Sequence, residues 1–333
     1  MDPLTQGAFG ALFSQTNGKS KDLAKAAVIG VIAGMAPDLD VLIGSSEDSL
    51  LALEYHRHFT HSLFFIPFGG LFCAMVLYPL LGRFWGVTFF QTLLWCILGF
   101  ASHGLLDSCT SYGTQLFWPF TDKRVAWDIV SIIDPLVTIP LLVLIGFSAL
   151  TKMRRYTIIG IAWVLLYFSF SFCQQGRAID EGLRLAEKRG LNVLNIEVKP
   201  SFANILIWKI ITTTDDSYYV DAVKVGRDKV VIWQGDSIKK LNLERDLPWL
   251  DLESQQRKDI ERFRWFSKGY IALDKNNSYR IVDIRYSLLP QEIKPLWGIE
   301  LSETNDKNKH IQFYNERGDS SNSAKTLWAM LLE

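Results

Sequence analysis

Four long apolar runs constrain the fold of this 333-residue chain more than any other feature. They cover residues 62–81, 87–106, 132–150 and 156–173, and none carries Lys, Arg or Glu in its interior. A helix needs about 20 apolar residues to cross the hydrocarbon core of a bilayer, whereas a soluble helix of that length normally shows a polar face. The runs therefore predict a polytopic membrane domain.

The character of the sequence changes after Cys173. Charged and polar side chains are interleaved from there on, beginning with a charged stretch over residues 175–189 that predicts a helix ending at Gly190. The sequence thus predicts an α-helical polytopic membrane domain followed by a soluble, β-rich α+β domain. The expected boundaries are 1–173 for the transmembrane domain, 174–190 for a linker helix and 191–333 for the soluble domain.

The soluble part carries strand patterns interrupted by one helix pattern. An amphipathic stretch over residues 252–266 predicts the helix, and alternating or β-branched segments predict the strands. The predicted strands cover residues 218–224, 229–233, 270–274 and 279–286. We find no zincin helix, nucleophile elbow or P-loop in the sequence.

Two shorter apolar segments precede the long runs. They cover residues 4–14 and 22–35, and each fits a short span, a re-entrant segment or an interfacial helix. The first residues lack the basic region of a cleavable signal peptide. Since the formal net charge is +0, no basic field points to nucleic acid as a partner.

Histidines and aspartates gather around the first two long runs. Three histidines fall within six residues before the first run, an Asp-Leu-Asp motif precedes them, and a His-x-x-x-Asp pair closes the second run. The i, i+4 spacing of that pair places both side chains on one face of a helix. Alternating spans put these clusters and two further aspartates on the same side of the membrane. The residues are Asp38, Asp40, His56, His58, His61, His103, Asp107, Asp128 and Asp134.

Imidazole nitrogens and carboxylate oxygens form a mixed ligand set that suits zinc, manganese or iron. Ionisable groups at membrane depth are costly and tend to have partners, which favours one shared site. The expected ligands of a divalent metal ion, zinc in the first place, are Asp40, His56, His61 and His103, and the expected catalytic carboxylates are Asp38 and Asp107. These groups outnumber the four ligands usual for zinc, so either some orient the histidines or the site holds two metals.

Five residues, Gln6 among them, are expected to support the site. Arg57 and His58 lie inside the histidine run, although local packing explains His58 equally well. Asp128 and Asp134 precede the third run, and Asp134-Pro135 is also a common way to start a helix.

Several motifs in this order resemble those of a known family, the membrane-bound metal-dependent hydrolases, also described as LexA-binding, inner membrane-associated hydrolases. The resemblance covers the membrane half and implies a hydrolase of the inner membrane with a metal site. The motifs are Met1-Asp2-Pro3-Leu4-Thr5 with Gly7, Pro37-Asp38-Leu39-Asp40, His56-Arg57, Thr60-His61-Ser62, His103 with Leu106-Asp107, Thr110 with Tyr112-Gly113, and Trp118-Pro119-Phe120.

The chain departs from the family pattern at Gln6, because the family commonly has Thr-His-Gly where this sequence has Thr5-Gln6-Gly7. If the family histidine is a ligand, the site here is one ligand short. His58 stands where relatives often carry glycine and is an extra histidine that would compensate.

The leading hypothesis is a metal-dependent hydrolase that cleaves an ester or phosphoester of an amphiphilic, lipid-like substrate at the bilayer interface. The alternatives are a transporter or proton- or metal-handling protein that uses the same cluster, and a non-catalytic anchor that binds a protein partner. If residues 22–35 cross the membrane, the lysines before and within this segment and the basic residues near 83 and 152–155 lie on the face opposite the site. The positive-inside rule then places the site and the C-terminal domain on the extracytoplasmic face.

Overall fold

The computed structural model describes all residues except 228, 305, 317 and 319. The chain forms two compact units, each of which gathers segments that are distant in sequence. The first unit consists of Met1–Leu42, Tyr55–Cys173 and Phe202–Asn204. The second unit consists of Ile43–Glu54, Gln174–Ser201 and Ile205–Glu333.

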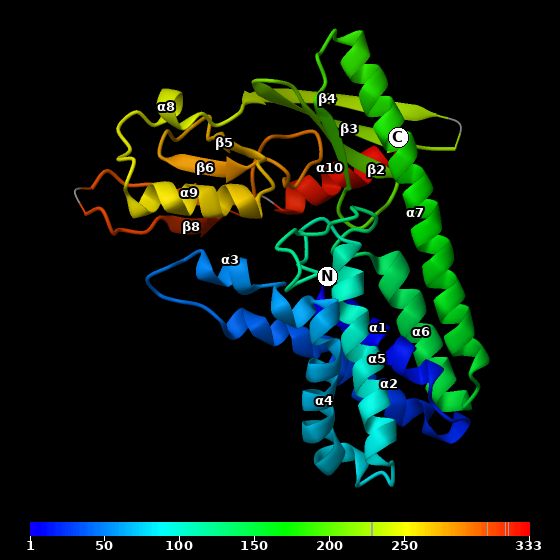
Figure 1. Ribbon diagram of the computed structural model, residues 1–333. Coiled ribbons are helices and arrows are strands. Elements are labelled where there is room, and N and C mark those ends of the chain that lie inside the picture. The colour runs from blue at the N-terminus through cyan, green and yellow to red at the C-terminus, as the bar shows by residue number, and fades with distance from the viewer. Residues whose placement is uncertain (228, 305, 317, 319) are drawn as a thin grey trace. The chain divides into compact units, whose positions relative to one another are not determined.

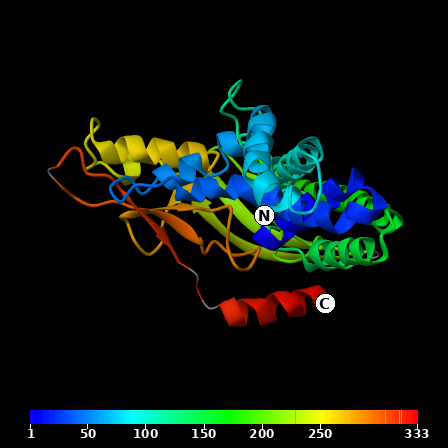
Figure 2. The same cartoon turned by 90° about the horizontal axis from the view of Figure 1, so that it is seen from below.

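The first unit is built from apolar helices, with a long connection between α5 and α6 at residues 109–134 (Figure 1). Helices α1, α2 and α5 pack against one another, and α4 packs against α5, as Figure 2 also shows from below. The helices are α1 (Pro3–Thr16), α2 (Leu23–Met35), α4 (Ile66–Leu77), α5 (Phe89–Ser108), α6 (Pro135–Thr151) and, as far as Cys173, α7 (Arg155–Lys188). Short turns of 3-10 helix occur at Ala36–Leu42, Phe59–His61 and Leu63–Phe65.

Three helical segments in the described part of the chain are long and apolar enough to cross a membrane: Leu63–Gly82, Phe89–Ser108 and Arg155–Lys188. They correspond to three of the four predicted runs. The other run forms α6, which is apolar but only 17 residues long. It is shorter than expected because Asp134 caps its start and Lys152, at φ 58°, ends it in a left-handed conformation.

The expected break between the last run and the linker helix is absent. Helix α7 continues for 34 residues through Cys173 and into the charged stretch. No proline interrupts this sequence, and Gly176 alone is too weak a signal to end a helix. The helix stops before Gly190, whose φ of 66° is the left-handed conformation expected of a glycine that ends a helix.

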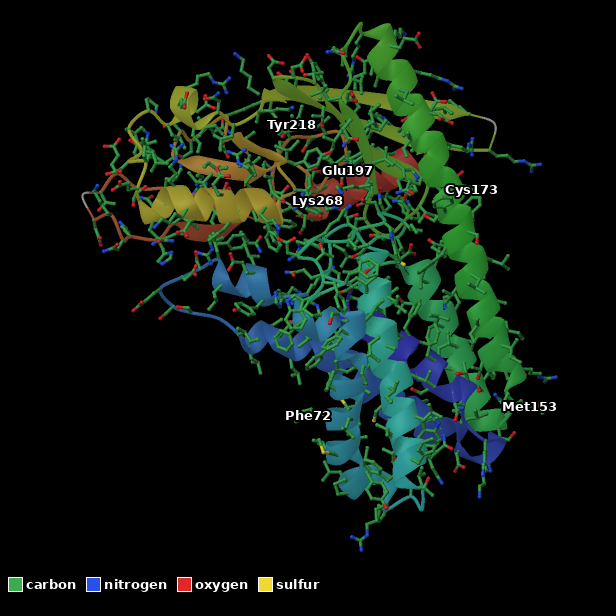
Figure 3. The ribbon with its side chains drawn as sticks, in the orientation of Figure 1. Phe72, Met153, Cys173, Glu197, Tyr218 and Lys268 are labelled. Carbon is green, nitrogen blue, oxygen red and sulfur yellow. The ribbon has the colours of Figure 1, made fainter. Side chains whose placement is uncertain are left out.

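Large apolar side chains remain exposed along the span helices. Phe72 on α4 is 62% exposed and Leu166 on α7 is 68% exposed. Figure 3 labels Phe72 on α4 and Met153, which is 46% exposed and lies just before α7. Such surfaces are costly in water but suit contact with lipid tails, in keeping with a membrane domain.

Glycines let α1 and α2 approach each other closely. A Cβ added to Gly30 would overlap the carbonyl oxygen of Gly10 and the side chain of Ser14, and one added to Gly34 would meet the Cα of Gly10. Ser14 in turn donates a hydrogen bond to the carbonyl of Trp95 on α5 at 2.8 Å. Small residues at helix contacts are typical of membrane proteins, in which close backbone packing drives association.

The second unit holds two four-stranded antiparallel sheets, which confirms the predicted β-rich α+β fold. The first sheet has the order β1-β2-β3-β4, with β1 (Asn195–Pro200), β2 (Ile207–Thr213), β3 (Ser217–Val225) and β4 (Val230–Lys239). The second has the order β5-β6-β7-β8, with β5 (Ile271–Leu273), β6 (Arg280–Asp283), β7 (Trp297–Glu300) and β8 (Gln312–Asn315). The helices of this unit are α8 (Leu243–Asp246), α9 (Gln255–Phe266), α10 (Ser320–Leu332), most of α3 (Leu51–Tyr55) and the end of α7 from Gln174.

The two sheets share one hydrophobic core. Val220 of the first sheet and Val282 of the second belong to the same buried cluster, together with Ile211 and Ala272. The four predicted strand segments fall within or overlap β3, β4, β5 and β6, whereas β1, β2, β7 and β8 were not predicted. The predicted helix begins three residues later than expected, because Ser254 caps it by accepting a hydrogen bond from the amide of Arg257.

Replacing Gly30 by alanine should lower the thermal stability of the detergent-purified protein. The added methyl group meets backbone atoms that cannot move away, and overpacking of this kind costs about 1–3 kcal/mol. The matched control is Gly146→Ala in α6, where an added Cβ meets nothing within 4 Å, so its melting temperature should stay the same or rise. Equal melting temperatures of the two variants would contradict the close α1–α2 contact.

Candidate metal site

Three segments of the first unit carry the histidine and aspartate residues that lie close together. The 3-10 turn that follows α2 holds Asp38 and Asp40, and the turn before the first span holds His61. Helix α5 holds His103 and Asp107 one turn apart, as their i, i+4 spacing predicts. These segments bring together Asp38 and Asp107, which are 69 positions apart in the sequence.

Asp38, His61, His103 and Asp107 each offer one ligand atom, and these four atoms lie within 4.8 Å of one another. Asp38 Oδ1 is 3.2 Å from His103 Nε2 and 3.5 Å from His61 Nε2, and Asp107 Oδ2 is 3.4 Å from His61 Nε2. The side chains of His61, His103 and Asp107 are 0% exposed, whereas that of Asp38 is 28% exposed. Among these four side chains, solvent therefore reaches that of Asp38 alone.

Three of these ligand atoms have no hydrogen-bond partner among the described residues. They are Nε2 of His61, Nε2 of His103 and Oδ2 of Asp107, and all three are buried. Buried polar atoms are nearly always hydrogen-bonded, because leaving one unsatisfied costs about 1–3 kcal/mol. Three unsatisfied atoms at one point, two nitrogens and a carboxylate oxygen, have the donor chemistry that a divalent cation requires.

The far nitrogen of each histidine ring is held by the protein. His103 Nδ1 lies 2.6 Å from the carbonyl oxygen of Gly34. Because a carbonyl only accepts, His103 Nδ1 must carry the proton, which leaves the lone pair on Nε2. His61 Nδ1 lies 3.2 Å from Asp40 Oδ2 and 3.0 Å from Thr60 Oγ1. A carbonyl or carboxylate behind a histidine is the usual way in which proteins orient a metal ligand.

The Asp40 carboxylate lies within hydrogen-bond distance of several groups. Its Oδ2 accepts from the amide of Arg57 at 3.0 Å and from Thr60 Oγ1 at 2.8 Å, and its Oδ1 lies 2.8 Å from His56 Nδ1. These contacts add to the one with His61. Asp38, Asp40 and His56 also offer ligand atoms within 4.8 Å of one another, so Asp38 belongs to two candidate groups. The second group differs from the first because two of its members, Asp40 and His56, are within hydrogen-bond distance of each other.

Asp107 is fixed by groups at both of its oxygens. Its Oδ1 accepts a hydrogen bond from Gln6 Nε2 at 2.8 Å and one from the amino group of Met1. Arg57 Nε lies 3.1 Å from Asp107 Oδ2, and Arg57 Nη1 donates to Thr110 Oγ1 at 3.1 Å. Gln6 thus occupies the position beside Asp107 and presents an amide, while its Oε1 has no hydrogen-bond partner among the described residues.

Electrostatics favour positive charge at this site. Burial alone would raise the pKa of Asp38, but His103 and His61 hold it well below its usual range. Burial alone would lower the pKa of His61, but Asp107, Asp38 and Asp40 raise it to about 10. Three carboxylates around one imidazole therefore attract a proton or a metal cation.

The other predicted site residues lie elsewhere. His58 packs against Trp118 and Tyr55, with both ring centroids 5.4 Å away, and it belongs to neither candidate group of described residues. Asp134 caps α6 by accepting a hydrogen bond from the amide of Leu136 at 3.0 Å. Asp128 is buried with a φ of 54° and is also outside both groups.

Two small residues shape the site without any signal in the sequence. Gly34 supplies the carbonyl that holds His103. A Cβ added to Gly104 would overlap the carbonyl oxygen of His61, so only glycine lets α5 approach the histidine turn this closely. Neither contact could be recognised before the elements were placed, because glycines are frequent in apolar helices.

A bundle of apolar, span-length helices that encloses a group of His and Asp side chains defines a polytopic membrane protein with a candidate metal site. Residues 1–178 match the family described as YdjM inner membrane protein. The match covers more than half of the chain, which therefore belongs to this family and is an inner membrane protein.

Two relatives extend this comparison. The chain is 26% identical over 277 residues to the uncharacterized protein YfhP of Bacillus subtilis (strain 168), covering 81% of this chain and 80% of the relative. It is 32% identical over 108 residues to the inner membrane protein YbcI of Escherichia coli (strain K12), covering 31% of this chain and 60% of the relative. No solved structure matches the chain.

Replacing Asp134 by alanine should lower stability without changing the metal content. The variant loses the cap on α6 and the hydrogen bond that Tyr167 donates to Asp134 Oδ2 at 2.6 Å, and loss of a cap costs about 1 kcal/mol. Asp134→Asn is the control, because asparagine caps a helix nearly as well. Thermal melting and elemental analysis check this, and loss of metal at an unchanged melting temperature would contradict the structural role.

Proposed function

We propose that the chain is a membrane-embedded, metal-dependent hydrolase that cleaves an ester or phosphoester of an amphiphilic substrate. The observation that supports this most strongly is the convergence of four ligand atoms, three of them buried without a hydrogen-bond partner among the described residues. Burying two imidazoles and a carboxylate at one point of an apolar helix bundle costs free energy unless a cation compensates them.

Asp38, His61, His103 and Asp107 would hold the cation, with zinc favoured over manganese or iron. Two nitrogens and two oxygens form a four-ligand set of the kind that zinc takes. In this assignment Asp40 orients His61 rather than binding the metal itself. His56 then supports Asp40, unless a second metal ion occupies the group that Asp38 shares with these two residues.

A divalent cation in such a site supplies Lewis acidity and lowers the pKa of water to about 7. The residues divide the remaining tasks by their exposure. Asp107 is buried and fixed by Gln6 and Arg57, so it serves as an anchor. Asp38 is the member of the group that solvent reaches, so it is the residue that we assign to proton transfer with a bound substrate.

The position of the site favours an amphiphile. Asp107 is the last residue but one of the span Phe89–Ser108, and His61 lies two residues before the span Leu63–Gly82. Both positions are at the ends of apolar segments, where a lipid headgroup meets water. We further propose that this end faces away from the cytoplasm, as the distribution of basic residues favours if α2 crosses the membrane.

A transporter that handles metal ions or protons is the second candidate. The complete burial of His103 and Asp107 inside a span helix favours it, because intramembrane ionisable residues often line ion pathways. The location of Asp107 at the end of the helix speaks for the hydrolase, since transport sites usually lie near the bilayer midplane.

The detergent-purified protein should contain stoichiometric metal, which His61→Ala or His103→Ala should remove. Each substitution deletes one of the two imidazoles of the four-residue group. His58→Ala is the matched control from the same histidine run and should retain the metal, because His58 is outside both candidate groups. Elemental analysis measures this, and wild-type protein without metal would overturn the proposal.

Replacing Asp38 by asparagine should separate catalysis from metal binding. The amide keeps an oxygen near the two histidines but cannot take up a proton, so hydrolysis per bound metal ion should fall by about 10²–10⁴-fold, even where the lost charge of this ligand weakens metal binding. The assay uses phospholipid vesicles together with soluble nitrophenyl esters and phosphoesters. Metal bound to the wild type without turnover of any of these substrates would instead favour the transporter.

A further inference from the structure

The segment that connects the two halves of the candidate site belongs to the other unit. Ile43–Glu54 is part of the C-terminal unit, whereas the residues directly before and after it are part of the membrane unit. The first stretch of the membrane unit ends at Leu42, and Asp40 lies two residues before that point. His56 lies two residues after Glu54, the last residue of the segment. The C-terminal domain therefore holds a piece of chain with site residues at both ends.

Arg262 of α9 attaches this segment through two carboxylates. Its Nε and Nη2 donate to Glu54 at 2.6 and 3.0 Å, and its Nη1 and Nη2 donate to Asp48 at 3.0 and 2.7 Å. Both contacts are bidentate, which is the strongest and most directional arrangement between arginine and a carboxylate. The Arg262 side chain is only 22% exposed, so water screens these pairs less than it screens surface pairs.

A second set of contacts fixes the same segment. Ser49 Oγ accepts from the amide of Phe313 at 3.0 Å and donates to the carbonyl of Ile311 at 3.1 Å. Asp259 Oδ1 lies 2.9 Å from Arg262 Nη1, and its Oδ2 lies 2.9 Å from His310 Nδ1. The arginine is thus itself held in place, and the segment is anchored near its middle and at its end.

The attachment reaches the site through a short path. Two residues of backbone span at most about 7 Å, so the position of Glu54 limits the positions that His56 can take. His56 Nδ1 lies 2.8 Å from Asp40 Oδ1, and the other oxygen of Asp40 lies 3.2 Å from His61 Nδ1. Each step is a hydrogen bond or a short piece of backbone.

We propose that Arg262 is a positioning residue of the metal site, through which the C-terminal domain sets the orientation of Asp40 and His61. This inference rests on the proposed function, because it assigns a control of that same site. Coupling between two sites is reciprocal. Metal binding in the membrane unit therefore also tightens the attachment of residues 43–54 in the C-terminal unit.

The first test measures zinc affinity of the full-length protein in detergent by competition with a chelator. Arg262→Met removes the ion pairs with Asp48, Glu54 and Asp259 but leaves a long apolar side chain. It should weaken zinc binding about 10–100-fold, as loss of a contact that orients a ligand typically does. Arg262→Lys keeps the positive charge but loses the planar guanidinium that makes two hydrogen bonds to each carboxylate. This variant should bind zinc more tightly than Arg262→Met. Arg264→Met is the matched control on the same helix, because Arg264 pairs with Glu261 at 3.1 Å, and it should bind zinc like the wild type.

Hydrogen exchange provides a readout that a purely structural role would not change. Removing zinc from the wild type should accelerate amide exchange in residues 43–54, whereas in Arg262→Met this segment should exchange rapidly with and without zinc. If the β2 and β3 amides of Arg262→Met also lose protection, the variant is unfolded, and Asp48→Asn combined with Glu54→Gln then replaces it with the same expectations.

The outcomes separate the two proposals. Wild-type protein that binds no zinc overturns the proposed function. Wild-type protein that binds zinc, together with an Arg262→Met variant or a folded double variant of equal affinity, overturns the positioning role of Arg262 and leaves the metal site intact.

Discussion

The burial of imidazole and carboxylate groups inside an apolar helix bundle is the constraint on which this membrane unit depends. His61, His103 and Asp107 are fully buried, and each leaves one atom without a hydrogen bond among the described residues. Such atoms destabilise a fold unless something compensates them. The surrounding residues hold the far nitrogen of each imidazole and Oδ1 of Asp107, and Arg57 pairs with Asp107 Oδ2. The two Nε2 atoms and this oxygen form one shared point for a cation.

The rest of the membrane unit can be understood from this requirement. Gly104 lets α5 reach the histidine turn, and Gly34 at the end of α2 exposes the carbonyl that fixes His103. The 3-10 turn after α2 presents Asp38 toward the histidines and Asp40 behind them. Close packing of α1, α2 and α5 is thus a condition for the geometry of the site as well as for stability.

Much of this architecture could be predicted from local patterns. The apolar runs predicted the span helices, and the i, i+4 spacing of His103 and Asp107 predicted their shared face. The different surroundings of Asp38 and Asp40 could not be predicted, because both stand in one Asp-Leu-Asp motif and only tertiary contacts distinguish them. Strand β2 was missed because its residues are buried nearly throughout and show no alternation. The attachment of residues 43–54 depends on Arg262, more than 200 positions away.

X-ray absorption spectroscopy at the metal edge of the purified, metal-loaded protein is the sharpest test of the proposed metal site, because it reports the ligand atoms themselves. We expect a shell of nitrogen and oxygen atoms at about 2.0–2.2 Å, the distances usual for zinc, with the outer scattering of two imidazole rings and no sulfur. A shell that contains thiolate sulfur, or one without imidazole, would contradict it.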